Sequence, residues 1–388
     1  MIIALSLLFP LFLSIKYPIS NLKTPLTLPL LFLIIIASIS SSIARYPEAS
    51  YRGIITLILI FIAIHILYLL INISDPRRIR QVLTLGIPCI FIFILGLSII
   101  QFINKGELIG RMTGTFRNPN EFGAMILIIL PIILAGMEGE DTKLVWLGAV
   151  SSVLSFIAIY FSYSRATYLA TIFLIGVIIV GNSIFTYQKK TIRLNKKMWI
   201  GISIIVLMGI YIYYVVPPEF FQYGVERYQS VIEYRGLTFE DSSLNQRYSA
   251  IWVSLKFFRE NPLLGIGIKN FNAYTTHLFG VGNIPATENT YLNLLSELGL
   301  LGFFIFMYII IKVFRTLIVN QREIKTSYLK CLNKYLIYGY ITLLFLMGTN
   351  DFLDDLRVFW LLPVVIISIK DLDNRLIMYY GESKEKSI

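Results

Sequence analysis

Charged residues, cysteine and histidine are all scarce in this sequence of 388 residues. Only 15% of the residues are charged, whereas a soluble globular domain carries about 25%. The two cysteines, Cys89 and Cys331, lie in or beside apolar runs, which argues against a disulfide framework. The two histidines, His65 and His277, are too far apart to offer a metal-ligand spacing. These scarcities argue against a soluble domain held together by disulfides or a metal, and against a Ser-His-Asp catalytic arrangement.

Apolar residues are abundant instead, at 56% of the chain with a mean hydropathy of +0.72. They form repeated runs of roughly 17–22 residues, long enough to cross a hydrocarbon core of about 30 Å as helices. A transmembrane barrel would need alternating apolar and polar residues, and these runs are continuously apolar. We therefore expect an all-α, polytopic integral membrane protein with about eleven spans, in a range of ten to twelve. The expected spans are 2–15, 26–43, 53–73, 82–103, 121–137, 143–163, 165–185, 198–216, 296–319, 331–349 and 355–370.

The net charge of +11 reflects how the helices are oriented and does not indicate a nucleic-acid partner. Placing the long polar segment outside puts about 21 of the 34 Lys and Arg residues on the inner side, as expected for cytoplasmic links. The N-terminus has no basic region before its apolar run, so we expect a first helix there and not a cleaved signal peptide. The predicted parts are N-terminal transmembrane helices (1–216), a large extracytoplasmic loop (217–295), and C-terminal transmembrane helices with a cytoplasmic tail (296–388).

The longest stretch that is incompatible with lipid runs from residue 245 to 302. Arg247 begins a predicted amphipathic helix, with Ile251, Trp252, Leu255 and Phe258 at helical spacing. Such a helix could lie on the bilayer surface with Trp252 at the interface. The following NPLLG ends the helix. GIGIKNF lacks the third glycine and the Lys-Ser/Thr pair of phosphate-binding loops, so we do not expect a nucleotide site.

Two arginines and one glutamate in or near the predicted outer links are candidates for chemistry. Arg165 lies in SYSRATYLA, at a turn between apolar runs, where a charge is costly unless it is paired or faces water. Arg165 and Arg247 are interpreted either as solvated or snorkelling charges or as anion clamps, because a guanidinium matches two phosphate oxygens at once. Pro285 and Thr287 predict a helix start that places Glu288 in the first turn.

Glu288 has two interpretations as well. The helix dipole favours a carboxylate in a first turn, or the carboxylate orients an acceptor hydroxyl, with Asn289 holding a sugar hydroxyl beside it. His277 is an alternative base, or an incidental loop histidine. The acidic cluster of Asp351, Asp354 and Asp355 is better explained as a solvated loop or a helix cap than as a cation site.

Several stretches of the sequence, taken in chain order, resemble the O-antigen ligase and O-antigen polymerase superfamily of bacterial membrane proteins. The resemblance covers about the C-terminal two thirds of the chain. It rests on Arg247 followed by Trp252 and on four further stretches, GTFRNPNEFGAMILIILP, SYSRATYLA, NPLLGIGIKNF and ENTYLNLLSELGLLG.

The resemblance implies a GT-C-like helical glycosyltransferase of the bacterial inner membrane, with its active site on the extracytoplasmic side and no metal, cofactor or nucleotide sugar. Its donor is a glycan on undecaprenyl pyrophosphate, and its acceptor is another glycan or lipid-linked sugar. An acceptor hydroxyl attacks the anomeric carbon with inversion, and the lipid pyrophosphate leaves. We expect a polymerase of O-antigen, capsule or exopolysaccharide repeat units. The alternative is an O-antigen ligase that uses lipid A-core as its acceptor.

Two non-enzymatic alternatives remain, a transporter of lipid-linked sugars and a scaffold protein. A transporter of lipid-linked sugars would need charged or broken helices at mid-membrane, and charges there are nearly absent. A scaffold protein fits arginines in several outer links less well. For the enzyme, the partners are the donor, the acceptor and membrane lipids, with no nucleic acid; a chain-length regulator or a flippase would be further partners.

The resemblance also assigns roles to individual residues. It places the pyrophosphate-binding arginines at Arg165 and Arg247. The family's base, usually a histidine followed by asparagine, falls on Glu288 followed by Asn289, so the chain departs from the family there. Either Glu288 replaces the histidine as the base, or it only orients the acceptor, or the protein is not a ligase in the usual sense. Candidates for binding donor phosphate or sugar are Arg117, Asn118, Asn120, Asn289 and His277.

Overall fold

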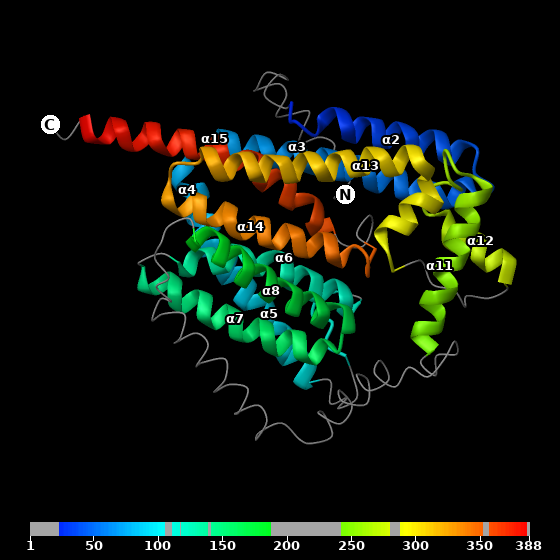
Figure 1. Ribbon diagram of the computed structural model, residues 1–388, viewed down its shortest axis with the longest axis horizontal. Coiled ribbons are helices and arrows are strands. Elements are labelled where there is room, and N and C mark those ends of the chain that lie inside the picture. Colours follow the sequence, from blue (N-terminus) through cyan, green and yellow to red (C-terminus); the bar gives the residue numbers. More distant parts are fainter. Residues whose placement is uncertain are drawn as a thin grey trace. The chain divides into compact units, whose positions relative to one another are not determined.

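The computed structural model describes residues 23–104, 111–116, 118–138, 141–187, 242–279, 288–351 and 357–385. These residues form helices joined by turns and short irregular segments, with no strand in any of the described ranges (Figure 1). The all-α class is therefore confirmed, and the chain is a polytopic membrane protein by the length and composition of its helices.

Six described helices are long and apolar enough to cross a membrane. They match the spans expected at 53–73, 82–103, 121–137, 143–163, 165–185 and 296–319. The run expected at 26–43 forms a shorter helix, α2 (Thr27–Ser42), whose 16 residues reach only about 24 Å at 1.5 Å per residue. The runs expected at 331–349 and 355–370 overlap the helices Ser327–Leu346 and Arg357–Glu385, which are not among the six. The runs at 2–15 and 198–216 lie outside the described residues. The total of eleven spans stays a prediction.

The chain divides into two compact units that are each discontinuous in sequence. The first unit takes its described residues from Met1–Pro76, Leu237–Glu323 and Met347–Ile388, and the second from Arg77–Gly236 and Ile324–Leu346. These units group residues by packing, whereas the predicted boundaries at 216 and 295 divide the chain by topology. The topological division therefore stays a prediction.

The first unit is built around α13 (Thr290–Glu323), which packs against α2, α11 (Ser242–Glu260) and α15 (Arg357–Glu385). Helix α3 (Pro47–Ile73) packs against α2 and α15, and α12 (Asn270–Phe279) against α3 and α13. The Arg375 guanidinium donates to the carbonyls of Ile71, Asn72 and Ser74, at 2.7–3.0 Å. A cation is favoured at this end of α3, because the last carbonyls of a helix lack partners within it.

Helix α13 breaks at Gly299, whose backbone lies in the left-handed region at φ 63°. A break frees amides and carbonyls that lipid cannot satisfy. The loop before α12 supplies their partners, through two bonds that it donates and two that it accepts. Its amides Ile266 N and Gly267 N donate to Ser296 O and Glu297 O, and its carbonyls Pro262 O and Leu263 O accept from Leu300 N and Leu301 N, all at 2.9–3.2 Å.

This docking explains the glycines of NPLLGIG and SELGLLG. A Cβ on Gly299 would lie 2.4 Å from the Leu263 carbonyl carbon, and one on Gly265 would lie 2.4 Å from that of Glu297. The buried Glu297 carboxylate accepts from the amides of Lys269 and Phe271, at 2.8 and 3.2 Å, and so holds the start of α12. The two motifs are therefore the two halves of one backbone junction.

Helix α11 packs one face within the first unit and exposes part of the apolar face that was predicted to contact a bilayer. Its packed residues are Ala250, Val253 and Phe257, which form a core with Ile266 and Phe271. Ile251 and Trp252 are exposed instead, at 39% and 55%. This exposure is compatible with the expected position of the helix on a bilayer surface, with Trp252 at the interface. Contact of the exposed face with a bilayer stays a prediction.

The second unit is centred on α6 (Pro119–Met137), the most buried of the six candidate spans. It packs against α7 (Thr142–Ser162), α8 (Arg165–Tyr187) and α14 (Ser327–Leu346). Helix α4 (Pro76–Gln81) continues through a π-helical turn (Val82–Gly86) into α5 (Ile87–Asn104), which packs against α7. The helices of this unit carry the remaining candidate residues.

Candidate active site

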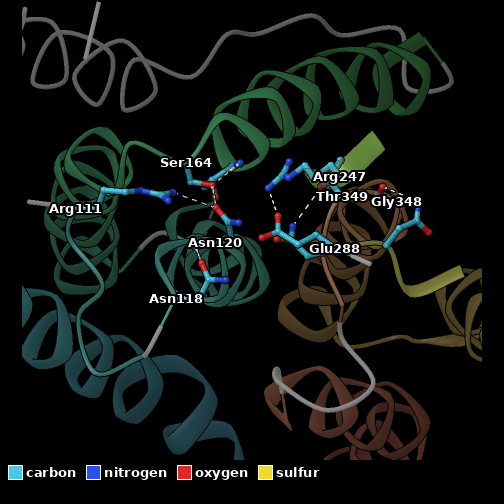
Figure 2. A network of polar contacts seen from close by, with 11 residues as sticks. Arg111, Asn118, Asn120, Ser164, Arg247, Glu288, Gly348 and Thr349 are labelled. Atoms are coloured by element: carbon cyan, nitrogen blue, oxygen red, sulfur yellow. Dashed lines mark hydrogen bonds and ion pairs between the residues drawn. The ribbon is translucent and has the colours of Figure 1, made fainter. Parts of the chain in front are cut away.

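Arg247 and Glu288 form an ion pair within the first unit, with the guanidinium donating to the carboxylate (Figure 2). Helix α11 begins at Ser242, so the prediction that Arg247 opens this helix was wrong by about one turn. The two side chains are 30% and 32% exposed. A pair this open can exchange one partner for an anion from solution, which a fully buried pair cannot do without a large desolvation cost.

Glu288 lies just before α13 and not in its first turn, which corrects the prediction. The helix begins at Thr290, because Asn289 caps it by accepting from the Leu292 amide at 3.1 Å. Pro285 and Thr287, which suggested an earlier start, lie outside the described residues. Glu288 is therefore held on the non-helical side of the cap, with its backbone fixed by its neighbour.

The start of α13 is anchored to the segment that follows α14. Asn289 Nδ2 donates to Gly348 O at 2.9 Å, and Thr290 Oγ1 donates to Asn350 O at 2.7 Å. Asn293 Nδ2 donates to the Asp351 carboxylate at 2.6 Å. Both polar groups of the Asn289 side chain thus take part in capping and anchoring. Asp351 pairs with an amide here, and Asp354 and Asp355 lie outside the described residues.

His277 lies exposed on α12 and stacks on Tyr46, with ring centroids 4.6 Å apart and the planes 5° from parallel. Tyr274 approaches the same tyrosine edge-on at 5.2 Å. The described ring contacts of His277 are therefore aromatic, and a role as a base stays a prediction.

Arg165 is the first residue of α8 in the second unit and is half-buried. Helix α7 ends at Ser162, and Tyr163 reverses the chain in the left-handed region at φ 47°, so Arg165 follows a turn between two helices, as expected. Ser164 then caps α8, accepting from the Thr167 amide at 3.3 Å. The helix dipole makes a cation at this N-terminal end unfavourable by about 0.3–1 kcal/mol. An anion bound there would interact favourably with both the dipole and the Arg165 guanidinium.

A polar network surrounds this reversal, as Figure 2 shows. Asn120 Oδ1 accepts from Ser164 Oγ at 2.6 Å and from Arg111 Nη2 at 3.3 Å. Asn118 caps α6 by accepting from the Asn120 amide at 2.9 Å. Arg117 lies outside the described residues. Sequence reasoning missed Arg111, although it lies in the same polar link as the predicted Arg117 and Asn118.

The structure thus brings some predicted site residues together and leaves others in separate units. Arg247, Glu288 and Asn289 lie within the first unit, and Arg165 and Asn120 within the second. Across the described ranges, no group of three or more His, Cys, Asp or Glu residues could hold a metal ion. The assembled groups are thus guanidinium, carboxylate and amide, which suit the binding of anions and hydroxyls.

Comparison with known proteins defines the class of protein first. Residues 150–307 match the family described as O-antigen ligase, whose members are membrane enzymes of the O-antigen ligase or polymerase type. This match confirms the resemblance to the O-antigen ligase and O-antigen polymerase superfamily that the motifs indicated. The matched segment contains Arg165, Arg247 and Glu288. No curated protein matches the chain significantly.

Proposed function

We propose that the protein is a glycosyltransferase of the bacterial inner membrane, acting at the extracytoplasmic face. It transfers a glycan from undecaprenyl pyrophosphate to a sugar hydroxyl and polymerises O-antigen, capsule or exopolysaccharide repeat units. The observation that carries the proposal is the partly exposed ion pair of Arg247 and Glu288. Such a pair offers a cation for a leaving pyrophosphate and a carboxylate for an incoming hydroxyl at one place.

The proposed reaction is a single displacement at the anomeric carbon of the donor. The acceptor oxygen forms the new glycosidic bond while the bond to the pyrophosphate oxygen breaks, and its electron pair leaves with the lipid pyrophosphate. The hydroxyl proton passes to the Glu288 carboxylate. Arg165 and Arg247 stabilise the charge that develops on the leaving group, which is the work of preorganised cations.

From this ion pair we also infer that the donor binds before the acceptor. A pyrophosphate carries more charge than a carboxylate and matches a guanidinium fork equally well, so the donor competes with Glu288 for Arg247. Donor binding would then release the carboxylate to meet the acceptor. Histidine, the usual family residue at this position, could not form the same pair, so the departure at Glu288 becomes part of the mechanism.

The O-antigen ligase reading is the second candidate, because the matched family bears that description. Incubating purified protein with one lipid-linked repeat unit separates the two. A ladder of products supports the polymerase. Transfer that begins only when lipid A-core is added supports the ligase and contradicts polymerisation.

The transporter alternative has one feature in its favour and one against it. The break in α13 beside buried Glu297 is the kind of discontinuity that transport sites use. However, the loop at 262–267 takes up the freed backbone groups, and the Glu297 carboxylate accepts from two amides. The break is thus filled by the chain itself, which favours the enzyme.

Arginine variants test the proposed function. We expect Arg165→Ala and Arg247→Ala to abolish chain extension, because each removes a cation that stabilises the leaving group. Arg259→Ala is the matched control, because Arg259 is exposed in the last turn of α11. Membrane insertion of all three variants should equal that of the wild type. Polymer of normal length from either Arg165→Ala or Arg247→Ala would contradict the proposal.

A further inference from the structure

Arg111 joins the ends of three helices in the second unit. Its Nε donates to Ser162 O at the end of α7, at 3.1 Å, and its Nη2 donates to Asn120 Oδ1 on α6. The next residue continues the attachment, because Met112 N donates to Phe161 O at 2.8 Å. Through Asn120 the contact reaches Ser164, the cap of α8. Figure 2 shows Arg111, Asn120 and Ser164 converging.

The Ser164 hydroxyl uses its full hydrogen-bonding capacity in this network. It donates its one proton to Asn120 Oδ1 at 2.6 Å and accepts from the Thr167 amide and the Thr167 hydroxyl, at 3.3 and 2.9 Å. Ser164 is completely buried, and Asn120 is 5% exposed. A hydroxyl with one donor and two acceptor sites therefore has a single orientation here, and that orientation depends on Asn120.

Two local features of the reversal need to be held in place. Tyr163 has a left-handed backbone, which a non-glycine residue keeps only when its surroundings fix it. Arg165 places a cation at the positive end of α8, where nothing in the helix itself favours it. Because Arg165 directly follows Ser164, a movement of the cap moves the start of the arginine side chain by a similar amount.

We propose that Arg111 is a positioning residue for Arg165. It acts through Asn120 and the Ser164 cap, so that the Arg165 guanidinium is already aimed when the donor pyrophosphate binds. This inference rests on the proposed function, since it assumes that Arg165 binds the donor. Arg111 would thus have a role beyond binding the last carbonyl of α7. The inference also explains why Ser164, the cap of α8, is hydrogen-bonded to Asn120 on α6.

Kinetics with the lipid-linked donor test the proposal. We expect Arg111→Ala to lower kcat/KM about tenfold or more, because small misplacements of a binding group are costly, with a rise in the donor KM making up most of the loss. Arg111→Lys should recover part of it, since a lysine keeps one charged donor. Ser164→Ala, which leaves Arg111 intact, should also raise the donor KM, as Arg111→Ala does. An unchanged donor KM in Arg111→Ala would overturn the proposal.

Arg375→Ala is the matched control, because Arg375 closes the end of α3 in the other unit through three carbonyls. It should lower the unfolding temperature in detergent and leave the donor KM unchanged. If Arg111→Ala behaves like Arg375→Ala in both measurements, its role is only structural and the proposal fails.

A double-mutant cycle on the binding of undecaprenyl pyrophosphate separates this proposal from the proposed function. If Arg111 acts through Arg165, Arg111→Ala should weaken binding about tenfold in the wild type and less than twofold in Arg165→Ala. A full tenfold effect in both backgrounds would overturn the positioning role alone. Wild-type binding by Arg165→Ala would overturn the role of Arg165 in the proposed function, and with it this proposal.

Discussion

At the scale of single residues, the pairing of Arg247 with Glu288 is what the sequence could not predict. Each residue was a candidate from its type and its place in an outer link, but the two lie 41 positions apart. A charge pattern does not state which tertiary neighbour a side chain will meet. Arg111 was missed for the same reason, because only the folded reversal at Tyr163 brings it to Asn120 and Ser162.

Replacing Glu288 tests whether its charge matters. Glu288→Gln keeps the size and the polar atoms but cannot take the proton, so we expect transfer to fall about 10²-fold or more, as for loss of a general base. Glu288→His restores the usual family residue. Its transfer rate should fall as the pH drops below about 6.5, where histidine becomes protonated.

The measurement is the initial transfer rate with the lipid-linked donor between pH 5.5 and pH 8.5. Glu260→Gln is the control, since Glu260 is an exposed carboxylate at the end of α11. Full activity in Glu288→Gln would show that the carboxylate is dispensable.

At the scale of elements, the helices were predictable and their junctions were not. Continuous apolar runs indicated six spans that the structure contains as helices. The start of α13 was expected near Pro285 and Thr287, with the membrane span beginning at 296, whereas the Asn289 cap starts the helix at Thr290. The break at Gly299 was not predicted either, since a glycine within a helical pattern is ambiguous until the docked loop decides its backbone.

Gly299→Ala tests the junction between α13 and the loop. The new Cβ would meet the Leu263 backbone and force a side chain into a left-handed backbone, so we expect a destabilisation of about 1–3 kcal/mol. The unfolding temperature in detergent measures it. Gly96→Ala, in α5 with nothing within 4 Å of its added Cβ, should change that temperature little; an equal loss in both variants would contradict the role of the break.

The contact between α6 and α14 should depend on pH through Glu138, the residue that directly follows α6. Burial alone would raise the pKa of its carboxyl, but hydrogen bonds from Lys334, Cys331 and Tyr335, together with the lysine charge, outweigh it and lower the pKa below the ordinary 4.5. The contribution to stability is therefore complete above about pH 4.5 and is lost as the pH falls through the lower folded-state value.

We expect Glu138→Gln to unfold at a lower temperature than the wild type near pH 7. The difference should shrink as the pH falls from 4.5 through the lowered folded-state pKa of Glu138, because the wild-type carboxyl then becomes protonated as well. Thermal unfolding in detergent across this range measures both. A difference that stays constant with pH would contradict the assigned role of the charge.

At the scale of the whole molecule, composition was enough to indicate a multi-pass helical membrane protein. The grouping into two units that are discontinuous in sequence was not predictable, because apolar runs of similar composition carry no label for their neighbours. The number of membrane spans could not be predicted from the sequence either. Helix α2, for example, is apolar but has only 16 residues, fewer than the roughly 20 that cross a bilayer.

Reporter fusions test the predicted topology. A fluorescent protein that matures only in the cytoplasm should be bright after residue 325 and dark when inserted after residue 279. Alkaline phosphatase, which needs an oxidising compartment, should show the reverse pattern. The opposite result at both sites would place the loop and its arginines on the cytoplasmic side and invert the topology.

The docked break in α13 also bears on how the chain is made. Residues 262–267 leave the ribosome before residues 296–301, so the partners of the broken backbone already exist when α13 is synthesised. Ser40 on α2 has been made earlier still, and its hydroxyl donates to Glu297 O at 3.1 Å. Unpaired amides and carbonyls are costly in lipid. The order of synthesis therefore allows this helix to enter the membrane with its interruption already matched.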